Sequence, residues 1–239
     1  MSPTDRPESI ENRWDLLYRD YPEVYEEFAQ VEKQPNAVDH LCRHFPLAGK
    51  VVADVAAGTG ASTFKLAQHA AFVIGIEPEA AMRAIAVAEQ RARGIANVRF
   101  EAGTAEALPL ADRSVDAVVA VTSANPDVAA FAAECARVVR PGGLVLRIDI
   151  APGWYGGELA SVIFDDPSDQ PPAEPEREAI LARLGYDIHD FFMDQDYGTV
   201  EKIVRTYGFI FGKRTIDYIR AHNTTTIRWK ARIRYKRIA

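Results

Sequence analysis

The sequence predicts an α/β fold with a doubly wound, mostly parallel sheet. Strand-like and helix-like segments alternate from residue 50 to residue 150, and the strand-like segments are apolar almost throughout, as residues 115–121 illustrate. Such strands are typical of a parallel sheet whose two faces are both covered. The expected strands are 50–55, 72–77, 97–101, 115–121, 144–150, 187–193 and 225–237. The expected helices among them are 60–69, 79–93, 126–139, 174–184 and 198–220.

Helices are expected ahead of the first strand. Apolar and aromatic residues recur over 9–31 at a spacing close to 3.6, with an interruption at Pro22. This pattern predicts two amphipathic helical pieces, and a further helix is expected over 35–45.

The rhythm changes after residue 150. Glycines surround Trp154 and Tyr155, and the Asp- and Pro-rich stretch 165–175 indicates an irregular insertion. The last strand, 225–237, alternates between an apolar face and a basic one. We expect the basic face to be solvated and partly paired with acidic residues such as those at 165–178.

Composition favours a cytoplasmic globular protein. The chain has 239 residues, of which 48% are hydrophobic, and no apolar run approaches the length of a membrane span. The first residues lack the apolar region of a signal peptide, and the two cysteines, Cys42 and Cys135, are expected to be reduced thiols. A net charge of −6 weighs against a nucleic-acid-binding surface.

The junction after the first strand carries the most informative motif. It reads Asp54-Val55-Ala56-Ala57-Gly58-Thr59-Gly60, and its glycines let the backbone turn and approach a ligand closely. A dinucleotide site would have a third glycine where Thr63 stands. The motif resembles motif I of the class I S-adenosylmethionine-dependent methyltransferases, except that Ala56 replaces the first of the family's glycines.

Three further segments share this resemblance. Glu77 ends the second strand, where a carboxylate accepts hydrogen bonds from a ribose diol, and Pro78 follows it. The segment around Thr104 resembles the part of the family that borders the adenine. Residues 137–146, with Pro141-Gly142-Gly143, resemble the family's helix–turn–strand hallmark, in which proline ends the helix and glycines form the turn.

The resemblance implies a Rossmann-like seven-stranded sheet with an antiparallel last strand and an N-terminal helical lid. We expect one domain over 1–239, with the lid at 1–48, the cofactor-binding core at 49–150 and acceptor-side segments at 151–239. The implied cofactor is S-adenosylmethionine. Its expected ligands are Asp54, Ala56, Gly58, Gly60, Glu77, Pro78, Thr104, Ala105, Glu106 and Thr122.

Some of these residues have structural alternatives. Asp54 can instead stabilise a turn or cap a helix, and Glu77 can stabilise the N-terminus of the helix that starts near Pro78. Thr122 and the neighbouring Ser123 can equally form a turn.

The resemblance implies in-line methyl transfer to a small-molecule acceptor and leaves the acceptor open. Candidate acceptor-side residues are Trp14, Tyr18 and Tyr21 in the lid and Trp154 and Tyr155 after the fifth strand, with ordinary packing as the alternative for the lid residues.

His189, beside Asp190, is a candidate general base, although it can also be a structural residue. His40 and His44 have the spacing of metal ligands on a helix, but no third ligand is near in sequence, so no metal is expected.

Three alternatives remain open: a nicotinamide-dependent oxidoreductase, a non-catalytic methyltransferase-like binding domain, and an enzyme that uses S-adenosylmethionine for another reaction. Thr63, Asp54 and the Pro141 turn disfavour the oxidoreductase. We expect a monomer or homodimer with no nucleic-acid or membrane partner.

Overall fold

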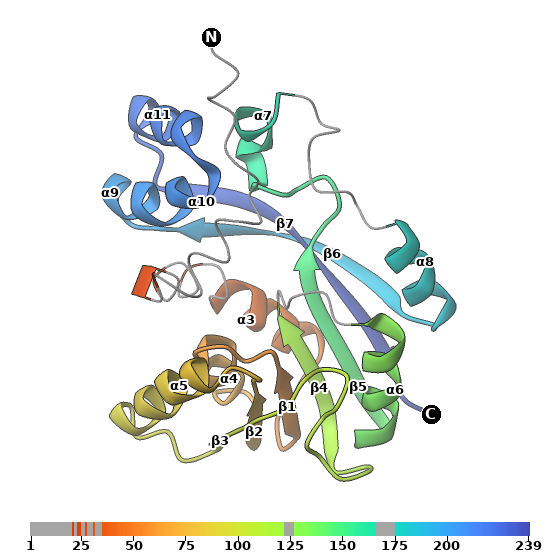
Figure 1. The fold of residues 1–239 in the computed structure, drawn as a ribbon. Helices are drawn as coiled ribbons and strands as arrows, with labels where there is room; N and C mark the ends of the chain where they lie inside the picture. The colour runs from red at the N-terminus through yellow and green to blue at the C-terminus, as the bar shows by residue number, and fades with distance from the viewer. Residues whose placement is uncertain are drawn as a thin grey trace. The chain divides into compact units, whose positions relative to one another are not determined.

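A computed structural model gives the fold of the chain (Figure 1). It describes residues 21, 23–24, 27, 31, 35–121, 127–165 and 175–239. The chain separates into two compact units, each described by itself below. Unit 1 comprises 1–32, 151–173 and 192–230, and unit 2 comprises 33–150, 174–191 and 231–239.

The seven predicted strands form one mixed sheet, as the sequence predicts. Its order is β3-β2-β1-β4-β5-β7-β6. The first five strands pair in parallel, and β7 pairs antiparallel with β5. The strands are β1 (Val51–Val55), β2 (Phe72–Ile76), β3 (Val98–Glu101), β4 (Val115–Val121), β5 (Val139–Ile150), β6 (Asp187–Asp196) and β7 (Thr226–Arg237).

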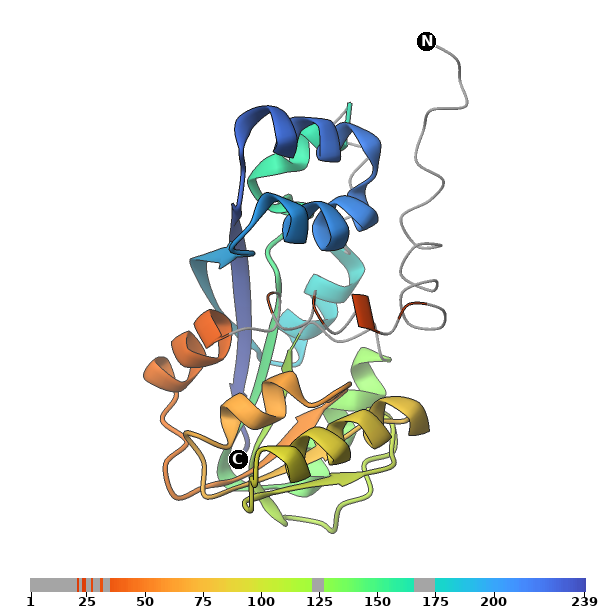
Figure 2. The ribbon, with the colours of Figure 1, turned by 90° about the vertical axis from the view of Figure 1, so that its left-hand side faces the viewer.

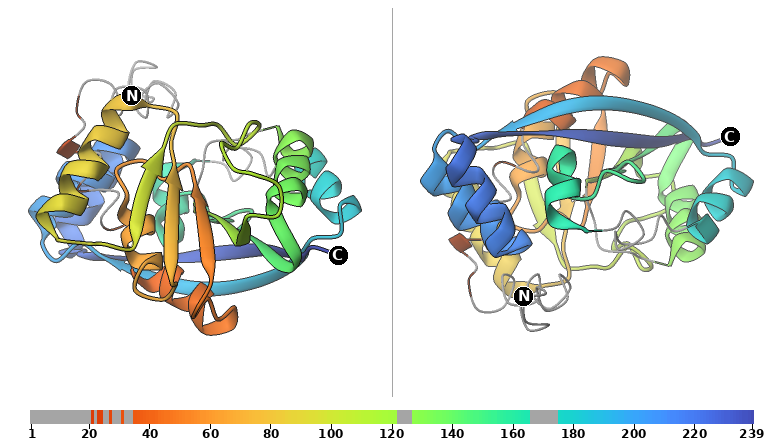
Figure 3. Two further views of the ribbon diagram at one scale, coloured as in Figure 1. Left: turned by 90° about the horizontal axis from the view of Figure 1, so that it is seen from below. Right: turned by 90° about the horizontal axis from the view of Figure 1, so that it is seen from above.

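The helices of unit 2 lie where the sequence predicts them, and α5 and α6 lie on either side of the parallel strands (Figure 3). A core cluster packs Phe131, Cys135 and Val138 of α6 against alternate residues of the strands, such as Val118. The intervening strand residues are also buried, which confirms a sheet covered on both faces. The helices are α3 (Pro35–His44), α4 (Ala61–Leu66), α5 (Ala80–Ala92), α6 (Val128–Val138) and α8 (Pro175–Arg183).

Asp116 is the polar exception within the apolar run of β4. Its carboxylate accepts a hydrogen bond from the backbone N–H of Val51 at 2.8 Å and another from Arg140 at 2.8 Å. Burial by itself raises the pKa of Asp116, but these two partners outweigh it and hold the pKa below its ordinary value. Asp116 therefore ties the start of β1 to β4 as a carboxylate.

Two predicted boundaries differ from the structure. The expected turn at Pro141–Gly143 lies inside one long strand, β5, whose register with β4 shifts between Val115 and Ala117. Gly142 has φ +81° there, so its glycine conformation makes an irregularity in the strand. The expected helix over 198–220 is interrupted by a π turn and then at Gly212, where φ is +86°.

Unit 1 is largely helical, and its helices gather around the segment after residue 150 (Figure 2). That segment contains a 3-10 turn at Gly157–Leu159 and one turn of helix, whereas most of the stretch 165–175, expected to be irregular, lies outside the described residues. The buried Tyr207 hydroxyl donates a hydrogen bond to the carbonyl oxygen of Gly156 at 2.6 Å and fixes the segment in place. The helices are α7 (Ala160–Ile163), α9 (Val200–Ile203), α10 (Phe209–Phe211) and α11 (Lys213–His222).

The basic face of β7 is more paired and more buried than expected. In unit 2 the Arg232 guanidinium donates to Asp190 at 2.7 and 2.9 Å. The Arg234 side chain is only 4% exposed and binds Asp149, at 3.0 Å, and Glu178. The expected pairing with acidic residues is thus confirmed for Glu178, whereas Arg234 is not solvated.

Two further observations concern the described part of the chain. Cys42 and Cys135 are free and buried, and burial raises the pKa of both thiols, that of Cys42 to about 12. No described helix combines the length and the apolar character that a membrane span requires.

Candidate functional site

The loop from β1 to α4 has an unusual backbone. Ala56, Gly58 and Gly60 all have positive φ, at 60°, 57° and 93°. Positive φ costs an alanine free energy that a glycine does not pay, so Ala56 keeps the conformation of the glycine it replaces. The N–H of Ala57 donates to the carbonyl oxygen of Ile76 at 3.0 Å, which anchors the loop to the end of β2.

Asp54 stabilises the C-terminal end of this loop, where α4 begins. It is fully buried, and its Oδ2 accepts hydrogen bonds from the hydroxyls of Ser62, at 2.8 Å, and Thr63, at 2.6 Å. These are charge-assisted bonds to the first turn of α4. Asp54 therefore performs the turn-stabilising role that was its structural alternative. Thr63, where a dinucleotide motif would have glycine, provides one of the two donors.

Glu77 lies at the end of β2 with 7% of its surface exposed. Its Oε2 accepts from the N–H of Gly58 at 2.9 Å, and its Oε1 accepts from the N–H of Glu79 at 3.0 Å. The first bond joins Glu77 to the glycine loop, and the second stabilises the start of α5. The carbonyl oxygen of the next residue, Pro78, accepts from Arg83 at 2.6 Å.

The segment after β3 is open to solvent. Thr104 and Glu106 are exposed and Ala105 is half-buried, and Thr104 forms an isolated antiparallel bridge with Ala107. Glu106 Oε1 accepts from the N–H of Asp127 at 3.2 Å, near the start of α6. Thr122 and Ser123 lie outside the described residues.

The predicted acceptor-side residues that the structure describes belong to unit 1. Tyr21 is 45% exposed and meets the ring of Phe209 edge to face. Trp154 and Tyr155 are half-buried, and Trp154 contributes to a cavity of about 360 Å³ that also contains Glu158 and Asp165. Two of the residues that line this cavity are therefore acidic, and Tyr155 does not line it. Trp14 and Tyr18 lie outside the described residues.

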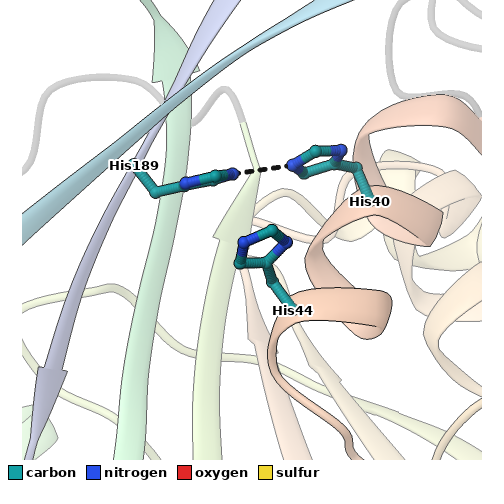
Figure 4. A group of neighbouring side chains, drawn as sticks. All are labelled: His40, His44 and His189. Carbon is teal, nitrogen blue, oxygen red and sulfur yellow. Dashed lines mark hydrogen bonds between the residues drawn. The ribbon is translucent and has the colours of Figure 1, made fainter.

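The structure brings His189 together with two histidines that the sequence analysis treated separately (Figure 4). His40 and His44 are on α3 and His189 is on β6, all in unit 2, and the Nε2 atoms of His40 and His189 are 2.8 Å apart. His189 is 149 residues from His40 in the sequence. Sequence spacing gives no signal for a neighbour so distant.

The side chains of the loop and of β2 suit a nucleoside cofactor. A carboxylate has about four acceptor positions, so Glu77 can bind its two backbone donors and still accept from a ribose diol. The positive φ at Gly58 and Gly60 favours glycine, and at Gly60 the space that a Cβ would take is occupied by the rings of Phe64 and Phe100. The Glu77 carboxylate at the end of β2 and the glycine loop after β1 therefore fit a nucleoside cofactor such as S-adenosylmethionine.

The chain is similar to known methyltransferases. A family model described as a methyltransferase domain matches residues 52–143. The chain is 36% identical over 115 residues to the ubiquinone/menaquinone biosynthesis C-methyltransferase UbiE of Rubrivivax gelatinosus. The aligned residues make up 46% of this chain and 43% of that protein. The chain thus spans less than half the length of this curated relative.

Solved structures share the fold. The YcgJ protein of Bacillus subtilis has a TM-score of 0.58 at 21% identity, over 85% of this chain and 99% of that one. Geranyl diphosphate C-methyltransferase of Streptomyces coelicolor, solved with geranyl diphosphate and S-adenosyl-L-homocysteine, has a TM-score of 0.56 at 17% identity, over 84% and 77%.

The S-adenosyl-L-homocysteine in that structure is the product form of S-adenosylmethionine, the cofactor that the resemblance implies for this chain. The matched residues include the β1–α4 loop, Glu77, the segment around Thr104 and the Pro141 irregularity. Over this core the chain is similar to known methyltransferases, which supports the resemblance to class I S-adenosylmethionine-dependent methyltransferases.

Proposed function

We propose that this chain transfers the methyl group of S-adenosylmethionine to a small-molecule acceptor. The observation that carries the proposal is the β1–α4 loop, in which three positive-φ residues stand beside the carboxylate of Glu77. The loop backbone would lie against the amino-acid part of the cofactor, and Glu77 would accept from the ribose hydroxyls. The exposed segment 104–106 would border the adenine, and Thr122 would lie near it after β4.

Asp54 is proposed to act chiefly as a positioning residue. Its bonds to Ser62 and Thr63 hold the first turn of α4 against the end of β1, so that the loop between them keeps its shape. A preformed loop lowers the conformational entropy lost on binding.

The cofactor, when bound, supplies an electrophilic methyl group on a sulfonium. The chain then has to hold an acceptor atom in line with that methyl group and exclude water, which accounts for large rate gains without an acid or base. Trp14, Tyr18, Tyr21, Trp154 and Tyr155 are proposed acceptor-side residues. Where the acceptor must lose a proton, His189 is the proposed base, because burial and His44 lower its pKa and leave the imidazole neutral at physiological pH.

The first test is a calorimetric titration of the purified chain with S-adenosylhomocysteine, with NADH and NADPH in parallel. We expect micromolar binding of S-adenosylhomocysteine, weakened at least tenfold in Glu77→Gln because the ribose loses a charged acceptor. Glu89→Gln is the matched control, since this carboxylate lies on α5 and pairs only with the exposed Arg93 among its described contacts.

Absence of S-adenosylhomocysteine binding, or equal affinity in the two variants, would contradict the proposed site. Tight NADH binding would favour the oxidoreductase instead. If the cofactor binds, the mass of the product formed with candidate acceptors distinguishes methyl transfer from other uses of the sulfonium and from a non-catalytic domain.

We also propose that the protein is cytoplasmic and acts as a monomer or homodimer. The support for the location is the pair of buried free cysteines, which fits a reducing compartment. Sedimentation at micromolar concentration tests the oligomeric state.

A further inference from the structure

His40, His44 and His189 form a compact cluster in unit 2, referred to here as the histidine cluster. His40 and His44 are one helical turn apart on α3, and residues four apart on a helix lie on the same face. His189 approaches them from β6 (Figure 4). One ring nitrogen from each residue lies within 4.8 Å of those of the other two.

The spacing of these nitrogens is close to that of a metal site. Zinc binds imidazole nitrogen at about 2.0–2.1 Å, so two tetrahedral ligands lie about 3.3 Å apart. The Nε2 atoms of His40 and His189 are 2.8 Å apart and need to separate by about half an ångström. His44 is exposed, and its ring already lies beside that of His189, with ring centroids 4.0 Å apart, so a small movement would complete the set.

The surroundings hold the rings and keep them neutral. The ring of His40 stacks on Phe191, with centroids 3.9 Å apart and planes within 5°. Burial, followed by the neighbouring His189, His44 and Arg43, lowers the pKa of His40 to about 4. The pKa of His189 is also lowered, by burial and by His44, although Asp190 opposes this. A neutral imidazole is the form that binds metal.

We propose that His40, His44 and His189 bind one divalent transition-metal ion of the zinc class, with three imidazole ligands and a fourth position open to water. Imidazole nitrogen favours zinc, nickel and copper, whereas magnesium and calcium require oxygen ligands that this cluster lacks. The site uses none of the residues assigned to the cofactor. It does use His189, and a ring nitrogen that binds a metal ion cannot also accept a proton, so at that nitrogen the metal site and the proposed base role of His189 exclude each other.

A hydrogen-bonded histidine pair is the competing explanation. One neutral imidazole can donate to the other across 2.8 Å, and that accounts for His40 and His189 without an ion. It does not require His44, whose ring centroid is 4.0 Å from that of His189. The contribution of His44 therefore separates the two explanations.

The test is a calorimetric titration of the full chain, without an affinity tag and freed of metal by a chelator, with zinc chloride at pH 7.5. Cobalt(II) in a parallel sample reports coordination through its visible absorption. We expect one ion per chain and a tetrahedral cobalt spectrum. His44→Gln should weaken binding by more than the ~10–100-fold that loss of an outer-shell partner costs.

His222→Gln is the matched control, because this exposed histidine lies in unit 1 and bonds to the carbonyl oxygen of Tyr218. It should leave zinc affinity unchanged. His189→Asn should abolish the cobalt spectrum, and thermal melting of each variant checks that it folds. His44→Gln keeps the proposal testable if His189→Asn fails to fold, because an exposed side chain adds little to stability.

The proposal is overturned if no stoichiometric zinc binding occurs. It is also overturned if His44→Gln binds zinc as tightly as the parent chain, because the pair alone would then suffice, or if the cobalt spectrum is octahedral.

Discussion

Replacement of Gly60 by alanine tests whether the β1–α4 loop has the backbone that the cofactor site requires. A Cβ at Gly60 would lie 2.8 Å from Cε2 of Phe64 and 2.9 Å from Cζ of Phe100. Phe64 is only 4% exposed, so its ring has little room to move. The substitution also places an alanine at φ +93°. Strain in the left-handed region costs about 1–2 kcal/mol and overpacking about 1–3 kcal/mol.

Because alanine also restricts the unfolded chain, by about 0.4–1 kcal/mol, the expected net loss for Gly60→Ala is about 2–4 kcal/mol. Gly94 provides the control: it has φ +64°, but a Cβ there meets nothing within 4 Å. Gly94→Ala should therefore cost about 1 kcal/mol or less. In a chain of this size each kcal/mol lowers the Tm by about 2–4 °C.

The assay is denaturant unfolding of both variants, followed by titration with S-adenosylhomocysteine. Gly60→Ala should be clearly less stable than Gly94→Ala and should bind S-adenosylhomocysteine at least tenfold more weakly than the parent chain, because the loop shifts to relieve the contact with the two rings. The reasoning is refuted if the two variants are equally stable, or if Gly60→Ala binds with the affinity of the parent chain.

Three further substitutions give distinct expected outcomes. Thr63→Val removes the 2.6 Å bond to the buried carboxylate of Asp54 and should cost about 1.5–3 kcal/mol in denaturant unfolding, whereas Thr63→Ser should cost less than 1 kcal/mol. Asp149→Asn leaves the buried Arg234 with one fewer anion and should cost about 3–5 kcal/mol, measured in the same way. Asp116 has a lower pKa in the folded than in the unfolded chain, so its stabilisation is complete above about pH 4 and is lost as the pH falls through the folded-state pKa. In denaturant unfolding from pH 7 to about pH 2.5, the free energy of unfolding should therefore fall less in Asp116→Asn than in the parent chain.

The parallel part of the fold is predictable because its signals are local. The apolar run of β4 and the glycines after β1 each specify a structure within a few residues. The prediction of one continuous helix over 198–220 was wrong, because the amphipathic pattern continues across Gly212 whereas the helix breaks there. Hydrophobic periodicity indicates which face of a helix is buried, but it does not indicate a break caused by the backbone conformation of one residue, here Gly212 with φ +86°.

The histidine cluster marks a second limit of the sequence. His40 and His44 have the spacing of metal ligands on a helix, but with no third ligand near in sequence the expectation is no metal, and His189 is expected only as a candidate base. The position that the three histidines share depends on how α3 and β6 pack. That packing is a tertiary property, and single-sequence patterns carry no distance between residues so far apart. The buried position of Arg234 was missed for the same reason, because alternation along β7 cannot show that Asp149 and Glu178 cover its polar face.

Ala56 shows how the loop keeps a family conformation without the family residue. It has φ 60°, which costs an alanine about 1 kcal/mol or more. The bond from Ala57 to Ile76 and the bond from Gly58 to Glu77 both hold the backbone on its C-terminal side, so long-range hydrogen bonds impose the conformation. Ala56→Gly should therefore leave the loop unchanged, since relief of about 1 kcal/mol of strain is offset by the entropy that glycine gains in the unfolded chain, about 0.4–1 kcal/mol. A change in unfolding free energy of more than about 1 kcal/mol, or a tenfold change in S-adenosylhomocysteine affinity, would mean that the residue and not the hydrogen bonds sets the shape of the loop.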